Sequence, residues 1–104
     1  MIVYEVNLEV DVAVLDEFRA WLRAHMAEIL ALPGFVDAML FDVREPVPTP
    51  HRHGLCVQYR LHNSVALDHY LREHAPRLRA DGAARFPNRF TATRRVMSQA
   101  SAPA

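Results

Sequence analysis

The chain has 104 residues, of which 51% are hydrophobic and 23% are charged. This length and composition are typical of one small globular domain and exclude a disordered or fibrous protein. The 12 basic residues, all of them arginine, balance 12 acidic ones, so general binding to nucleic acid or to an anionic membrane is not expected.

Missing residue types exclude several kinds of chemistry. Without lysine there is no Schiff-base or Walker A mechanism, and three glycines are too few for a glycine-rich phosphate loop. Cys56 is the single cysteine, which excludes an internal disulfide and fits a reducing compartment. No signal peptide or membrane helix is expected, and the expected location is therefore the cytoplasm.

The first two elements follow from a change in hydrophobic period. Residues 2–10 alternate between apolar and polar side chains, which predicts a strand with one apolar face. Over residues 12–31 the spacing changes to three and four, which predicts a helix. Asp11 is expected to cap this helix, and Pro33-Gly34 to end it with Gly34 at positive φ. The apolar stripe consists of Leu15, Phe18, Leu22, Met26 and Ile29.

Residues 35–44 and 54–62 predict two further strands, separated by an exposed loop with prolines at 46, 48 and 50. A second helix is expected over 64–81, capped by Asn63 or Ser64 and ended by Asp81-Gly82. Pro76 predicts a kink or break near residue 75. Residues 86–97 are expected to form a last strand. The predicted domain therefore spans residues 1–97, and residues 98–104 are expected to be a disordered tail.

The order β-α-β-β-α-β predicts an α+β, ferredoxin-like sandwich. In this fold a four-stranded antiparallel sheet, of order 4-1-3-2, carries two helices on one face. The strand at 35–44 is apolar on both faces, and both helices are already used. A second copy of the chain is therefore expected to cover the open face of the sheet, which gives a homodimer.

Several segments together form a familiar pattern: MIVYEVNLEVD at 1–11, Trp21, His25-Met26, Leu30, Pro33-Gly34-Phe35, VQYR at 57–60, Ala75-Pro76, Leu78-Arg79 and Arg85-Phe86. Through them most of the chain resembles a family of short bacterial proteins known as a domain of unknown function. More distantly it is similar to the dimeric α/β-barrel superfamily, which includes antibiotic-biosynthesis monooxygenases, haem-degrading monooxygenases and muconolactone isomerases. The resemblance implies a dimeric α/β barrel with a cavity between the sheet and the helices.

The resemblance also implies residue roles. Cofactor-independent monooxygenases of the superfamily use an asparagine on the first strand and a tryptophan on the first helix, and Asn7 and Trp21 match in type and element. Haem-degrading members use a histidine of the second helix as an iron ligand, where His74 lies. The residues around His74 do not match those enzymes, so no haem or other cofactor is predicted.

His25 follows Trp21 by four residues and is expected to lie beside it on the helix. Histidine has an intrinsic pKa suited to a general base, and an indole can stack on a flat molecule. The alternative is a half-buried histidine that only hydrogen-bonds the backbone. His74 points nearer the middle of its stripe and is read either as a ligand-binding residue or as a core histidine.

The polar set predicted on the open face of the sheet allows two interpretations. Glu5, Asn7, Gln58, Arg60 and His62 could form a pocket in which Asn7 and Arg60 hold an oxyanion. Alternatively, Glu5 and Arg60 could pair across strands within a dimer interface. The arginines between residues 77 and 95 are interpreted as a solvated, locally paired surface.

His51 and His53 have a spacing that would point both rings the same way in a strand. Two ligands fall short of the usual three or four, so no metal site is predicted there.

The sequence therefore predicts a small homodimer that binds a small planar or hydrophobic molecule and resembles a cofactor-independent monooxygenase. The candidate catalytic residues are His25, Asn7 and Arg60, and the candidate ligand-binding residues are Glu5, Trp21, Gln58 and His74. The alternative is an interaction protein without catalysis, whose polar sheet face is only a dimer interface.

Overall fold

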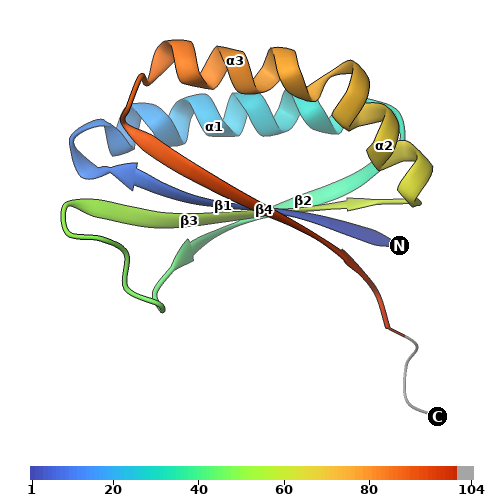
Figure 1. Ribbon diagram of the computed structural model, residues 1–104, viewed down its shortest axis with the longest axis horizontal. Coiled ribbons are helices and arrows are strands. Elements are labelled where there is room, and N and C mark those ends of the chain that lie inside the picture. Colours follow the sequence, from blue (N-terminus) through green and yellow to red (C-terminus); the bar gives the residue numbers. More distant parts are fainter. Residues whose placement is uncertain (101–104) are drawn as a thin grey trace.

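A computed structural model describes residues 1–100 of the chain. Four strands and three α-helices, with one short 3-10 helix, form two layers (Figure 1). In chain order the elements are β1 (Ile2–Asp11), η1 (Val12–Val14), α1 (Leu15–Leu30), β2 (Phe35–Val43), β3 (Arg52–Leu61), α2 (Ser64–Glu73), α3 (Ala75–Arg85) and β4 (Phe90–Ser98).

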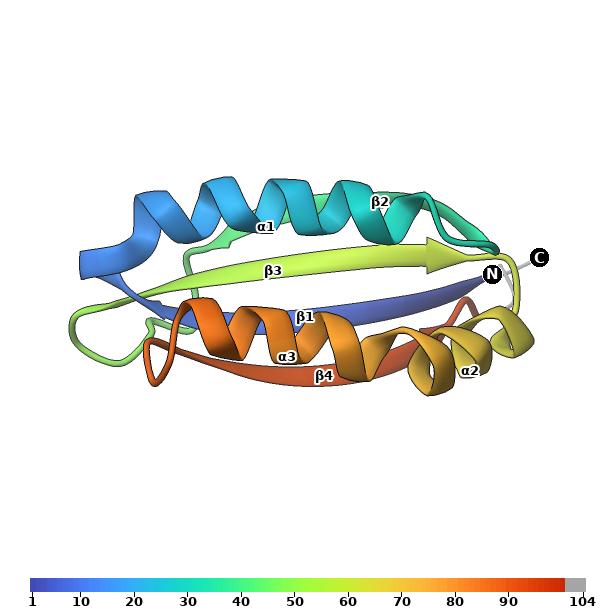
Figure 2. The same cartoon turned by 90° about the horizontal axis from the view of Figure 1, so that it is seen from above.

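The sheet has the order β2-β3-β1-β4, and every neighbouring pair is antiparallel. All helices lie on one face of it, with α1 and α3 side by side along the strands (Figure 2). The predicted ferredoxin-like fold and its strand order are therefore confirmed. No helix among residues 1–100 is both long and apolar enough to cross a membrane.

The core lies between the two layers, and strand parity decides which side chains enter it. In β1 the even-numbered residues face the helices, as predicted, and Tyr4 and Leu8 are opposite Tyr59 and Leu55 of β3. Phe18 and residues on the same stripe of α1 complete the core. Burial of this contiguous apolar surface is what holds the helices on the sheet.

The predicted C-terminal signal of the first helix is present, whereas Asp11 caps the 3-10 helix η1 and not α1, whose N-cap residue Val14 makes no side-chain cap hydrogen bond. The carboxylate of Asp11 accepts a 3.1 Å hydrogen bond from the backbone N–H of Ala13, and η1 precedes α1 as a tighter first turn. Gly34 has a φ of 89°. A Cβ atom there would lie 2.3 Å from Cβ of Ala66 on α2, so both the conformation and the space require glycine.

The second helix is broken where Pro76 predicted, since α2 ends at Glu73 and α3 begins at Ala75. The predicted end at Asp81-Gly82 is wrong, because α3 continues to Arg85. Gly82 is buried against Trp21 instead of terminating the helix. A glycine can mark close packing as well as a helix end, and the sequence pattern does not separate the two.

Several strand boundaries also differ from the prediction, most of all the start of the last strand, because β4 begins at Phe90 and not at residue 86. β3 begins at Arg52, because β1 continues to Asp11 and supplies a partner for it. β4 extends to Ser98, and the backbone N–H of Gln99 donates a 3.3 Å hydrogen bond to the carbonyl of Met1. Of the segment predicted as a tail, residues 101–104 lie outside the described residues.

Candidate functional site

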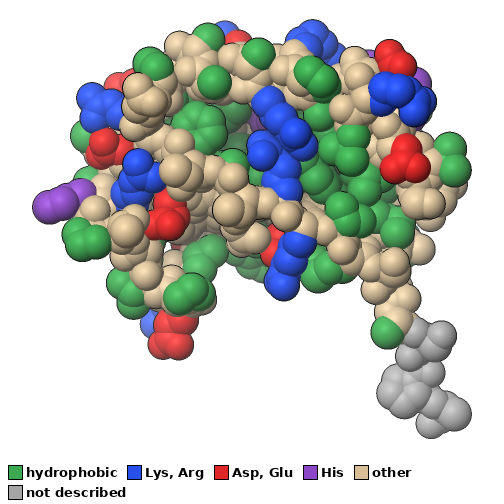
Figure 3. All heavy atoms as spheres, in the orientation of Figure 1, with side chains coloured by type: hydrophobic (Ala, Val, Ile, Leu, Met, Phe, Trp, Pro, Cys, Tyr) green, Lys and Arg blue, Asp and Glu red, His purple; other side chains and the backbone are tan. Residues whose placement is uncertain are grey.

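A cavity of about 260 Å³ lies between the sheet and helices α1 and α3, and we call it the helix-side cavity. In Figure 3 this face of the molecule is hollowed between the helices and β4. Among the described residues that line the cavity there is no aspartate or glutamate. Its walls are largely apolar, and six of the lining residues are aromatic: Tyr4, Phe18, Trp21, Tyr59, Tyr70 and Phe90.

Trp21 and His25 both line this cavity from α1. Their rings stack with centroids 4.6 Å apart and an interplanar angle of 25°, so the predicted neighbourhood of these two residues is present. The indole Nε1 donates a 3.1 Å hydrogen bond to Asp81 on α3. Gly82 leaves room for the indole, since a Cβ atom there would lie 2.9 Å from Cη2 of Trp21.

The environment of His25 favours a neutral imidazole. Burial lowers its pKa below the ordinary 6.5, and the positive charge of Arg94 acts in the same direction. Glu28 and Asp81 oppose this effect but do not overcome it. An imidazole that is neutral at physiological pH can accept a proton, as a general base must.

Three tyrosines, from β1, β3 and α2, line the cavity together. Tyr4 stacks on Tyr59 with centroids 6.1 Å apart and meets Tyr70 edge-on at 5.9 Å. Burial raises the pKa of Tyr59, and it raises the pKa of Tyr70 to about 12. The hydroxyls of these two residues therefore stay protonated, and they are hydrogen-bond donors rather than charges.

Two arginines at the cavity were not singled out from the sequence. Arg79 of α3 donates a 2.9 Å hydrogen bond from Nη2 to the hydroxyl of Tyr4, and Arg94 lines the cavity from β4. Arg94 has the same parity as Phe90 and Ala92, which face the helices. This parity is the sequence feature that places Arg94 at the cavity. The sequence interpretation of the arginines between residues 77 and 95 as a solvated surface does not use it.

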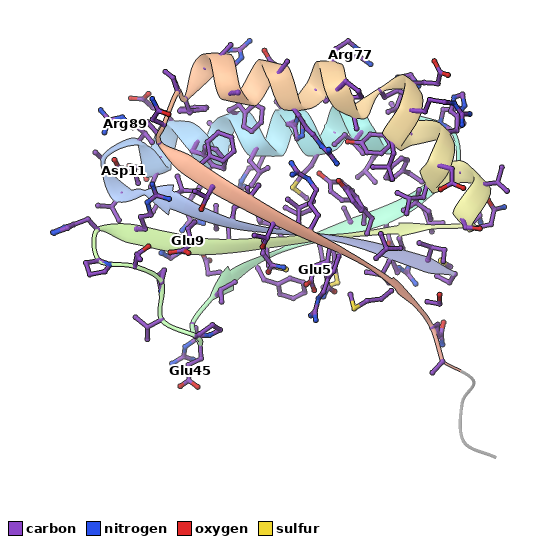
Figure 4. All side chains as sticks on the ribbon, in the orientation of Figure 1. Glu5, Glu9, Asp11, Glu45, Arg77 and Arg89 are labelled. Carbon is purple, nitrogen blue, oxygen red and sulfur yellow. The ribbon has the colours of Figure 1, made fainter. Side chains whose placement is uncertain are left out.

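The predicted polar set lies on the other side of the sheet. Figure 4 shows Glu5 beneath the sheet, on the face away from the helices. This carboxylate is 3% exposed. It accepts hydrogen bonds from Asn7 at 2.9 Å, from Gln58 at 2.8 Å and from Arg95. These interactions, with that of Arg95 the largest, lower the pKa of Glu5 to about 2.

The predicted pair between Glu5 and Arg60 is wrong, and the strand register explains why. Arg95 of β4 is directly opposite Glu5, whereas the residue of β1 opposite Arg60 is Val3. On its other side Arg60 is opposite Asp37 of β2. The guanidinium of Arg60 binds that carboxylate through two nitrogens.

The structure therefore does not bring the predicted catalytic residues together. His25 and Trp21 line the helix-side cavity, while Asn7 and Arg60 belong to the opposite face of the sheet. Successive side chains of a strand point to opposite faces, so Asn7 cannot share a wall with the even-numbered residues of β1.

A second hollow lies on the open face, and we call it the open-face pocket. It has a volume of about 240 Å³ and lies between the strands and the β2–β3 loop. Glu9 of β1 holds this loop against the sheet through its carboxylate, which accepts hydrogen bonds from both the backbone N–H and the hydroxyl of Thr49. Asn7 lines this pocket together with Pro46 and Val47.

The remaining histidines lie apart from both hollows. His74 is at the junction of α2 and α3, where Arg77 donates to its Nδ1 at 3.1 Å. Arg77 lies on the outer side of α3 (Figure 4). His51 has a φ of 66° and precedes β3, while Nε2 of His53 lies 2.7 Å from a carboxylate oxygen of Asp42. Within residues 1–100 no three potential metal ligands cluster.

Comparison with known proteins gives a family and a fold. Residues 1–100 match a family described as a domain of unknown function (DUF4286), which confirms the predicted resemblance. No functionally curated protein matches the chain. An antibiotic biosynthesis monooxygenase is among the solved structures that share the fold, so the more distant resemblance is confirmed at the level of fold.

Three of these solved structures illustrate the likeness. A mutant of SnoaB, a cofactor-independent oxygenase from Streptomyces nogalater, is 16% identical and has a TM-score of 0.69, covering 97% of this chain and 95% of that chain. HapK from Hahella chejuensis is 18% identical with a TM-score of 0.68, covering 100% and 97%. A mutant of MhuD with two manganese protoporphyrin IX groups bound per active site is 17% identical with a TM-score of 0.66, covering 100% and 99%.

The likeness to MhuD invites a comparison of the porphyrin with the residues present here. His74, the second-helix histidine considered as an iron ligand, does not line the helix-side cavity and hydrogen-bonds Arg77. The described residues therefore do not offer that ligand to the cavity.

Proposed function

The chain belongs to the DUF4286 family, a domain of unknown function, and we propose that it binds a small, planar, largely apolar molecule in the helix-side cavity. The observation that carries this proposal is the cavity itself. Its volume of about 260 Å³, its aromatic walls and its lack of a lining carboxylate suit an organic molecule with a flat apolar body. Trp21 offers that body a ring face to pack against.

The enzymatic form of this proposal assigns proton transfer to His25. Its imidazole is kept neutral by burial and lies on the cavity wall, so it can take an acidic proton from a bound molecule. Activation of the molecule by deprotonation would need no cofactor. The name of SnoaB as a cofactor-independent oxygenase supports this direction by likeness of fold.

We also propose that a second copy of the chain covers the open face of the sheet. Met39 and Phe41 of β2 are 60% and 39% exposed there, whereas Glu5 of β1, which lies across β3 from them, already forms an ion pair with Arg95. Apolar side chains around a satisfied polar cluster suit an interface between proteins. In this arrangement Asn7, Gln58 and Arg60 serve the dimer and not the cavity.

The cavity proposal can be tested by calorimetric titration with 2-naphthamide, a neutral planar probe. We expect the wild-type chain to bind one molecule per chain. Ala83 is exposed on α3 and lines the cavity, so Ala83→Phe should fill the cavity and abolish binding. Ala84→Phe is the matched control, because Ala84 is equally exposed and does not line it.

Two results would overturn the cavity proposal. One is the absence of any binding by the folded wild-type chain up to millimolar probe. The other is unchanged binding in Ala83→Phe, which would place the probe elsewhere. A dimer that binds no probe would favour the alternative of an interaction protein without catalysis.

A further inference from the structure

Arg79 and Arg94 stand out among the twelve arginines of the chain. Seven arginines form ion pairs with carboxylates, including Arg77 and Arg85 on the same helix as Arg79. Arg95, the chain neighbour of Arg94, pairs with Glu5. Within the described part of the chain, Arg79 and Arg94 form no such pair, although both line the helix-side cavity.

The position of Arg94 is unusual for its charge. Its partner across the strands is Val6, and it shares the helix-facing side of β4 with Phe90 and Ala92. Arg94 is exposed at the cavity, so its charge is solvated without a carboxylate partner, and its guanidinium has donors left for an anion bound there. Figure 3 shows basic side chains crossing the middle of this face, beside the hollow.

Arg79 is already partly oriented toward the cavity. Its Nη2 donates to the hydroxyl of Tyr4, which itself lines the cavity. A guanidinium has five N–H donors in a planar fork, so donors remain for a further partner. The lining holds no aspartate or glutamate, and the neutral His25 adds no charge. The two guanidinium groups therefore face the cavity with their charge uncompensated.

We propose that the molecule bound in the helix-side cavity is a planar aromatic carboxylate, with its ring system against Trp21 and its carboxylate bound by Arg79 and Arg94. This inference rests on the proposed binding function and specifies in addition that the ligand is an anion. Arginine binds carboxylates through paired N–H donors, which gives both charge and geometric complementarity. The apolar walls hold the ring, and the two arginines select the anion.

The test compares two probes of the same size and shape. In 2-naphthoate a carboxylate replaces the neutral amide of 2-naphthamide, and calorimetry gives both dissociation constants. We expect the wild-type chain to bind 2-naphthoate about tenfold more tightly or better, as charge-assisted hydrogen bonds predict. Arg94→Gln and Arg79→Gln should each lower this preference, measured as the ratio of the two dissociation constants, several-fold.

Control variants separate a local effect from a change in total charge. Arg72→Gln removes one positive charge from α2, where Arg72 pairs with Glu73 away from the cavity, and should keep the full preference. Arg94→Lys keeps the positive charge and should retain part of the preference for 2-naphthoate. Circular dichroism spectra of all variants establish that they fold.

The possible outcomes are distinguishable. Equal affinities for the two probes in the wild-type chain would overturn this inference and leave the proposed cavity function standing. A preference that survives both glutamine substitutions would overturn the assignment to Arg79 and Arg94. The absence of binding by either probe would overturn the proposed function itself, and this inference with it.

Discussion

The indole Nε1 of Trp21 donates a 3.1 Å hydrogen bond to Oδ2 of Asp81, which joins helix α1 to helix α3 beside the helix-side cavity. At the next residue, Gly82, the ring packs so closely that an added Cβ atom would lie 2.9 Å from Cη2 of Trp21. One face of the indole stacks on His25. The position of the ring, and with it the shape of the cavity, is therefore set by Asp81, Gly82 and His25.

Gly82→Ala tests this packing directly. The added Cβ would lie 2.9 Å from Cη2 of Trp21, and overpacking of this kind costs about 1–3 kcal/mol. Replacement of a helical glycine by alanine stabilises a helix by about 1 kcal/mol. We therefore expect the free energy of unfolding, measured by urea unfolding followed by circular dichroism, to fall by about 1 kcal/mol. In a Trp21→Phe background the clash is absent, and the same substitution should become neutral or stabilising. An equal loss in both backgrounds would show that the indole is not the obstacle.

The pH titration of His25 is a second test. Because burial lowers its folded pKa below the ordinary 6.5, we expect its imidazole to titrate below pH 6.5 in an NMR experiment, with His25→Gln identifying the signal. The stability that this neutral histidine contributes is fully present above pH 6.5 and is lost as the pH falls toward the folded pKa. Arg94→Gln should raise the midpoint. A midpoint at or above 6.5 in the wild-type chain would contradict the buried, neutral base.

Glu5 predicts a different pH dependence. Its folded pKa of about 2 lies below the ordinary 4.5, so its contribution to stability is present above pH 4.5 and declines as the pH falls toward 2. We expect Glu5→Gln to lower the free energy of unfolding at pH 7 by about 2 kcal/mol, and to flatten its fall between pH 4.5 and 2. Glu17→Gln, at an exposed position of α1, is the control. A wild-type slope in Glu5→Gln would argue against the ion pair with Arg95.

The proposed dimer gives a prediction about mass. Native mass spectrometry and light scattering should find a dimer for the wild-type chain. Phe41→Asp should shift it to monomer, because Phe41 is exposed on the open face of the sheet. Val65→Asp places the same charge on α2, where Val65 is 74% exposed, and should leave the dimer intact. A wild-type monomer, or a dimeric Phe41→Asp, would remove the open face as the interface.

The fold could be predicted because the spacing of apolar residues along the chain distinguishes strands from helices. The alternation in β1 and the three-four spacing in α1 fix which faces are apolar, and the order of elements then leaves one compact topology. The neighbourhood of Trp21 and His25 followed in the same way, since residues four apart on a helix are adjacent.

The candidate site was only half predicted, for two physical reasons. Asn7 is an odd-numbered residue of β1, and the odd-numbered side chains of this strand face away from the helices. Strand parity therefore already predicts that Asn7 does not share a site with His25. The roles of Arg79 and Arg94 depend on which charges lie nearby in space, and composition cannot give the partners of each arginine. The predicted helix end at Gly82 is wrong because glycine occurs both at helix ends and where a helix packs closely against another group.

The most direct test of the central claim is a crystal structure of the chain soaked with 2-naphthamide, because it locates the bound molecule. We expect density for a flat ring in the helix-side cavity, against Trp21 and between α1 and β4. Density only in the open-face pocket, or a cavity filled by the protein's own side chains, would contradict it.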